Sequence, residues 1–299
     1  MDDKTAFIFP GQGGQFVGQG KAWAESDEKV REIFRTADEV TGRPISKFSF
    51  EGPLEDLTMT ANLQPAVLAV SLAAASLLKS KGKVPDYAAG HSLGEYAALC
   101  VAGVFDEATA FELVCQRAAL MQKAAMNNPG TMAAILNLDI PTIESICELA
   151  RAEGMVVIAN YNTPQQTVIS GTSRAVAAAT RFAQAKGGRS VPLPVSGAFH
   201  SPLMSESASV FSDILRDTDF RPPRIPVIPN SLGTPVTDPY ELKNRLVAQM
   251  TSPVRWVTTV NSLVSAGVRN FLECWPRPYL TNMLKKCLAD ELGASIGLP

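Results

Sequence analysis

The sequence predicts an α/β protein in which a large domain built on a parallel sheet carries a smaller inserted subdomain. Short apolar segments with strand character alternate with longer segments of helical periodicity towards both ends of the chain. Between them, residues 131–194 follow the order strand, helix, strand, strand, helix, strand, which is the pattern of a ferredoxin-like unit. We therefore expect residues 1–128 and 196–299 to form the large domain and residues 129–195 to form the subdomain.

The composition suits a protein with a sizeable core. The chain has 299 residues, is 46% hydrophobic and carries a formal net charge of −2, without a basic block that would indicate a nucleic acid partner. The longest apolar run, residues 66–78, is shorter than the roughly 20 residues that cross a bilayer, and the N-terminus lacks the pattern of a signal peptide. The five cysteines form no C-x-x-C pair. We therefore expect a reduced, cytoplasmic protein without a membrane partner or a metal site.

The most informative stretch is residues 90–96, with the sequence GHSLGEY. It follows a short apolar strand at 85–89 and leads into a helix at 96–102, so Ser92 lies where a strand turns sharply into a helix, with a glycine two residues before it and another two residues after it. This is the nucleophile-elbow pattern. It predicts an α/β-hydrolase-like large domain with Ser92 as nucleophile. The alternative is a glycine-rich turn that contains a serine by chance.

A glycine-rich loop follows the first predicted strand, residues 5–10. Its spacing does not fit G-x-G-x-x-G, because Gly14 is followed by three other residues before Gly18. We therefore reject a dinucleotide site and expect no cofactor. The backbone N–H groups of this loop could instead donate to an oxyanion formed at Ser92.

The remaining elements are predicted from periodicity, caps and turn residues. Pro65 suits the first turn of a helix, and Asp106 is a candidate N-cap. The predicted helices span residues 23–40, 65–79, 96–102, 107–125, 141–153, 173–186, 202–216, 241–249, 260–266 and 279–292. The predicted strands span residues 5–10, 85–89, 131–137, 155–161, 166–170, 189–194 and 268–273, with one further short strand within 220–239.

Arg117 lies within the apolar face of the predicted helix 107–125. Two interpretations are open. Arg117 could bury its alkyl stem and extend its charge to water, or its guanidinium could occupy a pocket that needs an anionic partner, such as a substrate carboxylate. Three- and four-residue spacing gives the other members of this face as Ala110, Leu113, Val114, Leu120, Met121 and Ala124.

The two histidines of the chain are the candidate bases for Ser92. His91 directly precedes the serine, and we expect its side chain to point away from the hydroxyl. His200 lies on a loop before the predicted helix 202–216 and is the better candidate for a general base. The alternative is a purely structural histidine.

Together these residues resemble the malonyl-CoA:acyl carrier protein transacylase family over nearly the whole chain. Each matching segment is modest by itself, but the ordered set is specific. The matching segments are residues 9–15 (FPGQGGQ), 90–96 (GHSLGEY), 116–117 (QR), 130–134 (GTMAA), 161–164 (YNTP), 197–200 (GAFH) and 249–256 (QMTSPVRW).

The resemblance implies roles for the matched positions. Ser92 would be the acylated nucleophile, His200 its base, and the backbone carbonyl of Gln249 would orient His200. The backbone N–H groups of Gln12 and Leu93 would form the oxyanion hole. Arg117 would pair with the malonyl carboxylate, and Phe199 resembles the version of its motif that selects malonyl over methylmalonyl groups. The implied substrate-binding positions are Arg117, His91, Asn162, Met121 and Phe199.

The implied activity is transfer of a malonyl group from malonyl-CoA to the phosphopantetheine thiol of an acyl carrier protein through an acyl-serine, in fatty acid or polyketide biosynthesis. We expect a monomer. The alternative activity is that of an acyl hydrolase, an editing thioesterase with the same Ser–His pair. Two positions depart from the family pattern: residues 273–278 (ECWPRP) replace a Gly-Pro-Gly-like turn, and Gln165 replaces a glycine. Neither belongs to the implied catalytic set, and both fit a specialised relative that serves a polyketide synthase.

Overall fold

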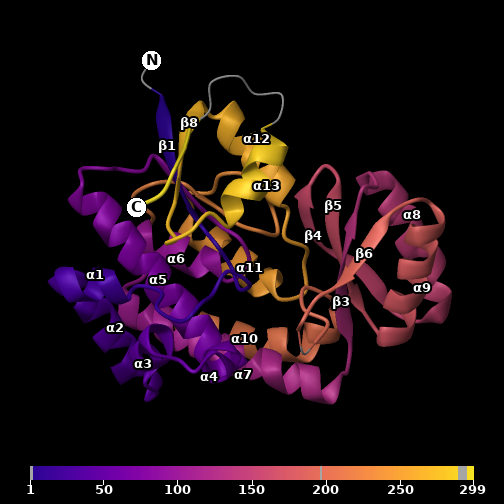
Figure 1. Cartoon of the computed structure of the whole chain (residues 1–299), viewed down its shortest axis with the longest axis horizontal. Helices are drawn as coiled ribbons and strands as arrows, with labels where there is room; N and C mark the ends of the chain where they lie inside the picture. Colours follow the sequence, from indigo (N-terminus) through magenta and orange to yellow (C-terminus); the bar gives the residue numbers. More distant parts are fainter. Residues whose placement is uncertain (1–2, 196, 289–294) are drawn as a thin grey trace.

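The structure is a computed structural model of the chain and describes residues 3–195, 197–288 and 295–299. Two lobes lie side by side (Figure 1), a large one with a parallel sheet and most of the helices, and a small one with an antiparallel sheet and two helices. The strands are β1 Lys4–Phe9, β2 Tyr87–Gly90, β3 Thr131–Leu136, β4 Val156–Thr163, β5 Gln166–Gly171, β6 Arg189–Pro192, β7 Val227–Ile228, β8 Val268–Glu273 and β9 Ser295–Gly297. The helices are α1 Lys21–Ser26, α2 Glu28–Thr41, α3 Ile45–Phe50, α4 Leu54–Thr58, α5 Thr60–Ser80, α6 Gly94–Val101, α7 Glu107–Asn127, α8 Ile140–Ala150, α9 Ser173–Ala185, α10 Ser205–Asp217, α11 Pro239–Gln249, α12 Trp256–Ser265 and α13 Leu280–Cys287, with short 3-10 turns at Arg151–Glu153 and Pro202–Met204.

The large lobe is built on a parallel sheet with the strand order β7-β2-β1-β8-β9. Alternate side chains of the central strand β1 point to opposite faces of this sheet. Phe7 and Phe9 join the core formed with α2, α5, α6 and α7, whereas Ala6 and Ile8 join a second core with α12 and α13. Because both faces are covered, the strand is a continuous apolar run. The predicted parallel-sheet domain is confirmed.

The small lobe has an antiparallel sheet with the strand order β4-β5-β3-β6. Helices α8 and α9 lie on its outer side (Figure 1), and their residues Ile146 and Ala179 share a core with Ile135 of the sheet. This order and connectivity are those of a ferredoxin-like unit, so the predicted fold class is confirmed. The boundaries 129–195 stay a prediction.

A backbone bridge connects the two lobes. The N–H of Tyr161 in β4 donates to the carbonyl of Val254 at 2.9 Å, and the N–H of Val254 donates to the carbonyl of Ala159 at 2.8 Å. Val254 belongs to the segment between α11 and α12 of the large lobe. Strand β4 is therefore hydrogen-bonded to the other lobe at its middle.

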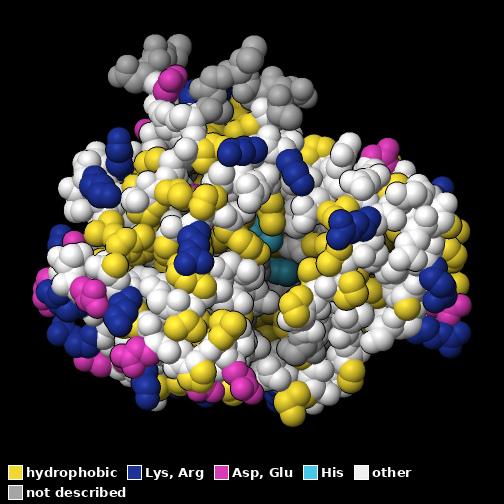
Figure 2. Space-filling view, in the orientation of Figure 1, with side chains coloured by type: hydrophobic (Ala, Val, Ile, Leu, Met, Phe, Trp, Pro, Cys, Tyr) yellow, Lys and Arg dark blue, Asp and Glu magenta, His cyan; other side chains and the backbone are white. Residues whose placement is uncertain are grey.

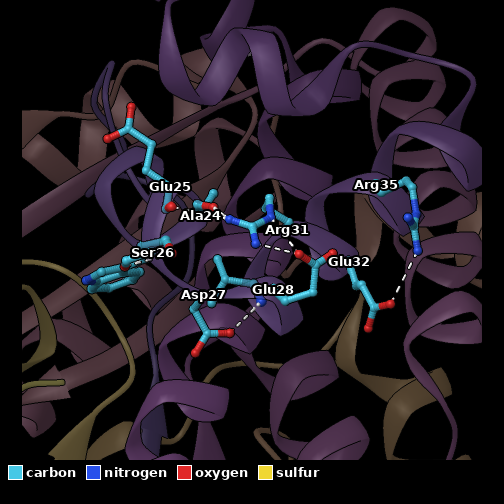
Figure 3. Close-up of polar contacts among 10 residues, drawn as sticks. Ala24, Glu25, Ser26, Asp27, Glu28, Arg31, Glu32 and Arg35 are labelled. Atoms are coloured by element: carbon cyan, nitrogen blue, oxygen red, sulfur yellow. Dashed lines mark hydrogen bonds and ion pairs between the residues drawn. The ribbon is translucent and has the colours of Figure 1, made fainter.

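The prediction of one helix over residues 23–40 is wrong, because two helices, α1 and α2, meet at Asp27 (Figure 3). Asp27 is extended, with φ −132° and ψ 123°, and its carboxylate accepts a hydrogen bond from the Val30 N–H at 3.1 Å. Arg31 reaches back from α2 to the carbonyl oxygen of Ala24 in α1 at 2.9 Å. The N-cap starts a new helix at a point where the apolar periodicity simply continues.

The helix predicted over residues 65–79 begins earlier, at Thr60, so Pro65 lies inside α5 rather than in its first turn. Nearly all of α5 between Asn62 and Ala75 is buried. Tertiary packing therefore outweighs the hydrogen bond that a proline cannot donate. By length and composition α5 is also the one helix, within the part of the chain that the structure describes, that could cross a membrane, but most of it is buried inside the large lobe.

Other differences concern short elements. Helices α3 and α4 and strand β9 were not predicted, because segments of three to six residues show too little periodicity to distinguish them from turns. The predicted helix 202–216 begins as a 3-10 turn and continues as α10. The last helix, predicted over 279–292, ends at Cys287, and residues 289–292 lie outside the described residues.

We predict that Asp27→Ala lowers the free energy of unfolding by about 1 kcal/mol, because the Val30 N–H loses its acceptor. Asp27→Asn keeps an acceptor oxygen and should remain close to wild type. Urea unfolding followed by circular dichroism measures the difference, with Glu25→Ala as a control at an exposed neighbouring position. An Asp27→Ala curve that overlays that of wild type would show that the cap contributes nothing.

Candidate active site

The strand–turn–helix predicted around Ser92 is present, between Gly90 at the end of β2 and Gly94 at the start of α6. Ser92 has a left-handed φ of 51°, which is strained for a serine. A Cβ at Gly90 would lie 1.9 Å from the carbonyl carbon of Gly94, and a Cβ at Gly94 would lie 2.1 Å from the carbonyl oxygen of Phe9. Only glycine fits at these two positions, so the turn that presents Ser92 depends on both.

The Ser92 hydroxyl lies 2.7 Å from Nε2 of His200. Nδ1 of His200 lies 3.0 Å from the carbonyl oxygen of Gln249 and 3.2 Å from that of Ser252. Because carbonyl oxygens only accept hydrogen bonds, Nδ1 carries the proton and Nε2 presents its lone pair to the hydroxyl. This tautomer can accept the proton of Ser92.

Arg117 is buried, with 1% of its surface exposed, and α7 places its guanidinium beside the elbow. Nη2 donates to Ser92 Oγ at 3.1 Å and to Gln249 Oε1 at 3.3 Å, and Nη1 donates to Gln64 Oε1 at 2.8 Å. Nε is buried without a hydrogen-bond partner among the described residues. The burial excludes the interpretation in which the charge extends to water, and the guanidinium retains an unused donor.

A second buried ionisable group, the carboxyl of Glu95, lies on the far side of Gln249. Its Oε2 accepts from Gln249 Nε2 at 2.8 Å and from the Asn230 N–H at 3.0 Å. Gln249 Nε2 also donates to the Ser92 carbonyl at 3.1 Å, and the Asn230 side chain accepts from the Ser92 N–H at 2.6 Å. The Gln249 side chain thus connects the elbow, the guanidinium and the carboxylate, although the resemblance gave a role only to its carbonyl.

Sequence reasoning missed three of these residues, Gln64, Glu95 and Asn230, each at most 2% exposed. A signal existed for the first two, because a polar side chain in an otherwise apolar helix must find a buried partner. No such signal exists for Asn230, which lies in the irregular proline-rich segment 220–239.

Burial sets the protonation of the site. Burial, and then the charge of Arg117, lowers the pKa of His200 to about 3, so the imidazole is neutral at pH 7, as a proton acceptor must be. Burial raises the pKa of Glu95 to about 7, against the hydrogen bond from Gln249 and the charge of Arg117. Burial also lowers the pKa of His91.

The predicted oxyanion-hole positions lie on either side of the elbow. Leu93 immediately precedes α6, at a helix N-terminus where backbone N–H groups lack helical partners. Within the described residues, the backbone N–H groups of Gln12 and Leu93 donate no hydrogen bond. Gln12 and Phe199 line a cavity of about 510 Å³, together with the turn between α4 and α5 and residues 194–195. Both amides therefore remain available as donors.

Figure 2 shows histidine side chains in a hollow between the two lobes, and contacts place the other predicted positions. His91 Nε2 lies 2.8 Å from Asn162 Oδ1, so the ring is turned towards the small lobe. Met121 is buried, and its Sδ lies 3.5 Å from Gln64 Nε2. Hydrogen bonds thus bring together two groups of predicted residues, one with Ser92, His200, Arg117 and Gln249, and one with His91 and Asn162.

A serine hydroxyl that faces a neutral imidazole can form an ester with an acyl group. A buried guanidinium beside that hydroxyl favours an acyl group that carries a carboxylate. The comparisons with known proteins agree with this class. Residues 6–296 match the family described as Acyl transferase domain, so the chain belongs to the acyl transferases.

The relatives described next share one named activity within that family. The chain is 40% identical to the malonyl CoA-acyl carrier protein transacylase of Bacillus subtilis (strain 168), over 95% of this chain and 90% of that protein. An acyl carrier protein S-malonyltransferase from Vibrio cholerae has a TM-score of 0.94 at 37% identity, covering 99% of this chain and 96% of that one. A malonyl-transacylase solved in complex with its type II PKS acyl-carrier protein has a TM-score of 0.93 at 35% identity, covering 99% and 94%. The chain is a member of the malonyl CoA-acyl carrier protein transacylase family.

We predict that Gln249→Ala lowers kcat/KM with malonyl-CoA by about tenfold or more, although it keeps the carbonyl that faces His200. The side chain accepts from the charged guanidinium of Arg117 and donates to Glu95. A hydrogen bond to a charged group contributes about 1.5–3 kcal/mol, and about 1.4 kcal/mol in the barrier is tenfold in rate. Gln184→Ala, at an exposed position of α9, is the control. Wild-type kcat/KM in Gln249→Ala would limit the contribution of residue 249 to its carbonyl.

Proposed function

We propose that this protein transfers a malonyl group from malonyl-CoA to the phosphopantetheine thiol of an acyl carrier protein. The observation that carries the proposal is the buried guanidinium of Arg117, with Nη2 3.1 Å from the Ser92 hydroxyl. A buried cation beside a nucleophile is explained if the acyl group brings its own carboxylate to that place. The names of the relatives support the same transfer, and one relative was solved with its carrier protein.

In the first half-reaction His200 Nε2 accepts the Ser92 proton while Oγ attacks the thioester carbonyl of malonyl-CoA. The backbone N–H groups of Gln12 and Leu93 stabilise the resulting oxyanion. When the tetrahedral intermediate collapses, the carbon–sulfur bond breaks and the CoA sulfur takes the proton from His200. The carbonyls at Gln249 and Ser252 orient the imidazole throughout.

The second half-reaction repeats these steps with the carrier protein as acceptor. The phosphopantetheine thiol gives its proton to His200 and attacks the malonyl ester at Ser92. The same oxyanion hole serves this step, and the ester oxygen leaves as the Ser92 hydroxyl with the proton from His200. The carrier leaves with the malonyl thioester, and the enzyme returns to its starting state.

Arg117 selects an acyl group that carries a carboxylate. Nε and Nη2 lie on one edge of the guanidinium, and a carboxylate can accept two parallel hydrogen bonds from such an edge. Nε has no partner among the described residues, and Nη2 has only neutral ones. A malonyl carboxylate would supply the missing acceptor and the missing negative charge, which an acetyl group lacks.

The remaining proposals concern the surroundings of the acyl group and of the protein. His91 and Asn162 would line the site from the small-lobe side, Met121 would line it from α7, and Phe199 would narrow the space beside C2 of the malonyl group.

We propose a cytoplasmic monomer that acts in fatty acid or polyketide biosynthesis without a nucleic acid or membrane partner. The near-neutral charge and the burial of α5 support this setting.

Mass spectrometry tests the nucleophile. Incubation with malonyl-CoA should add one malonyl group per chain, and peptide mapping should place it on Ser92. Ser92→Ala should take up none, because no other predicted nucleophile faces His200. Cys100→Ala is the control and should label like wild type. A malonyl group on a cysteine, or labelling of Ser92→Ala, would contradict the mechanism. Release of free malonate without transfer to a carrier protein would instead favour the acyl hydrolase.

Substrate selectivity tests Arg117. Wild type should prefer malonyl-CoA over acetyl-CoA by about 10²-fold or more, since a poorly solvated charged hydrogen bond contributes about 1.5–3 kcal/mol and two are made. Arg117→Ala should lose most malonyl transfer and gain relative activity on acetyl-CoA, and Arg117→Lys should recover only part, because a point charge cannot replace the planar fork. Methylmalonyl-CoA should be the poorer diacid substrate if Phe199 narrows the site.

The measurement is kcat/KM with malonyl-, methylmalonyl- and acetyl-CoA for each enzyme. Arg174→Ala is the control, because that arginine is exposed on the small lobe. An equal decrease with all three substrates in Arg117→Ala would mean that Arg117 supports the fold and does not recognise the carboxylate.

A further inference from the structure

The segment after β8, residues 274–279, overlaps the departure from the family pattern at 273–278 and packs on the glycine-rich loop 11–15. Its end is fixed by Glu273, the last residue of β8, which is completely buried. The Glu273 carboxylate accepts hydrogen bonds from the backbone N–H groups of residues 279–281 at distances between 2.7 and 3.2 Å. A buried carboxylate with this many donors holds the chain path after β8 firmly.

Tyr279 lies directly on the backbone of the loop. Its hydroxyl donates to the carbonyl oxygen of Gln12 at 3.2 Å. A Cβ added at Gly13 would lie 2.3 Å from the tyrosine Oη, and one added at Gly14 would lie 3.0 Å from its ring. Trp275, which is completely buried, meets the loop at the same place, with Nε1 3.2 Å from the position of a Cβ on Gly14.

Two further contacts complete the enclosure of the loop. The guanidinium carbon of Arg277 lies 3.6 Å from the ring centroid of Phe16, in cation–π geometry. On the other side, a Cβ added at Gly11 would lie 2.7 Å from the carbonyl oxygen of His91. The loop is therefore held between the elbow and the segment 274–279.

We propose that Tyr279 is a positioning residue that fixes the backbone of Gln12 so that its N–H faces the reacting carbonyl. This inference rests on the proposed function, in which that N–H is an oxyanion donor. The hydroxyl of Tyr279 and the side chain of Gln15, which accepts from the Gly13 N–H at 2.7 Å, hold the two ends of the peptide unit between Gln12 and Gly13. Gly11 packs on the His91 carbonyl on one side of Gln12, and the held peptide unit lies on the other, so together they restrict the orientation of the Gln12 N–H.

The effect of such a residue falls on kcat rather than on KM. The oxyanion exists in the transition state and the tetrahedral intermediate, not in the bound thioester. A donor that is already aligned needs no reorganisation when the charge develops. Loosening the loop therefore weakens transition-state stabilisation and leaves binding of the ground state nearly unchanged.

The test is Tyr279→Phe, which keeps the ring against the loop and removes only the hydroxyl. We expect the rate constant for malonylation of Ser92 in single-turnover experiments to fall by roughly tenfold, less than the 10²–10³-fold that follows loss of a whole oxyanion donor. KM for malonyl-CoA should stay within about twofold, and the thermal midpoint should match wild type. Amide hydrogen exchange in peptides covering residues 11–19 should be faster than in wild type. Tyr87→Phe is the matched control, because its hydroxyl lies at the opposite end of β2 from the elbow, where it accepts from Lys4 Nζ.

An unchanged malonylation rate constant in Tyr279→Phe, or a change confined to KM, would overturn the proposal. If that variant folds poorly, Gln15→Ala serves instead, because it removes the acceptor of the Gly13 N–H at the other end of the same peptide unit. A rate constant equal to that of wild type in Gln15→Ala would then overturn the proposal. The proposed function fails differently, because wild type itself would then form no malonyl ester on Ser92.

Discussion

The site depends on how a single positive charge is accommodated in the buried interior of the large lobe. Arg117 cannot become neutral by losing a proton, because a guanidinium stays protonated at any physiological pH. Its charge helps to keep His200 neutral, and it is connected through Gln249 to the carboxylate of Glu95. A primary amide suits this connection because one end accepts from the guanidinium and the other donates to the carboxylate. A glutamate at residue 249 would place two carboxylates together, and a leucine would remove one hydrogen-bond partner from Arg117 and one from Glu95.

The parallel sheet explains why groups so distant in sequence meet. Strands β2, β1 and β8 are adjacent, and the carboxyl ends of adjacent parallel strands lie at one edge of a sheet. The elbow follows β2, the loop with Gln12 follows β1, and the segment with Tyr279 follows β8. The nucleophile, an oxyanion donor and the segment that supports this donor therefore come from three consecutive positions along one edge.

The sequence was informative where a local rule determines the outcome. The glycines around Ser92 specify the elbow, and the alternation of strands and helices specifies both sheets. The sequence was less informative for residues whose function depends on a partner that is distant along the chain. The roles of Gln64 and Glu95 arise only because Arg117 and Gln249 contact them from other helices. Asn230 lies in a segment whose sequence shows no periodic pattern from which its backbone contact could be predicted. Likewise, the apolar periodicity did not predict the break at Asp27. There one carboxylate caps a new helix within a stretch whose periodicity is that of a single helix.

The backbone bridge between β4 and Val254 has a consequence for how an acyl group is admitted. Gln249 and Ser252, whose carbonyls hold His200, belong to the stretch of chain that leads to this bridge. A swing of the small lobe would have to break two main-chain hydrogen bonds and would pull on the support of the imidazole at the same time. The stretch of chain that orients the base is therefore also the stretch that joins the two lobes. An acyl group that enters between the lobes is thus met by a base whose support both lobes share.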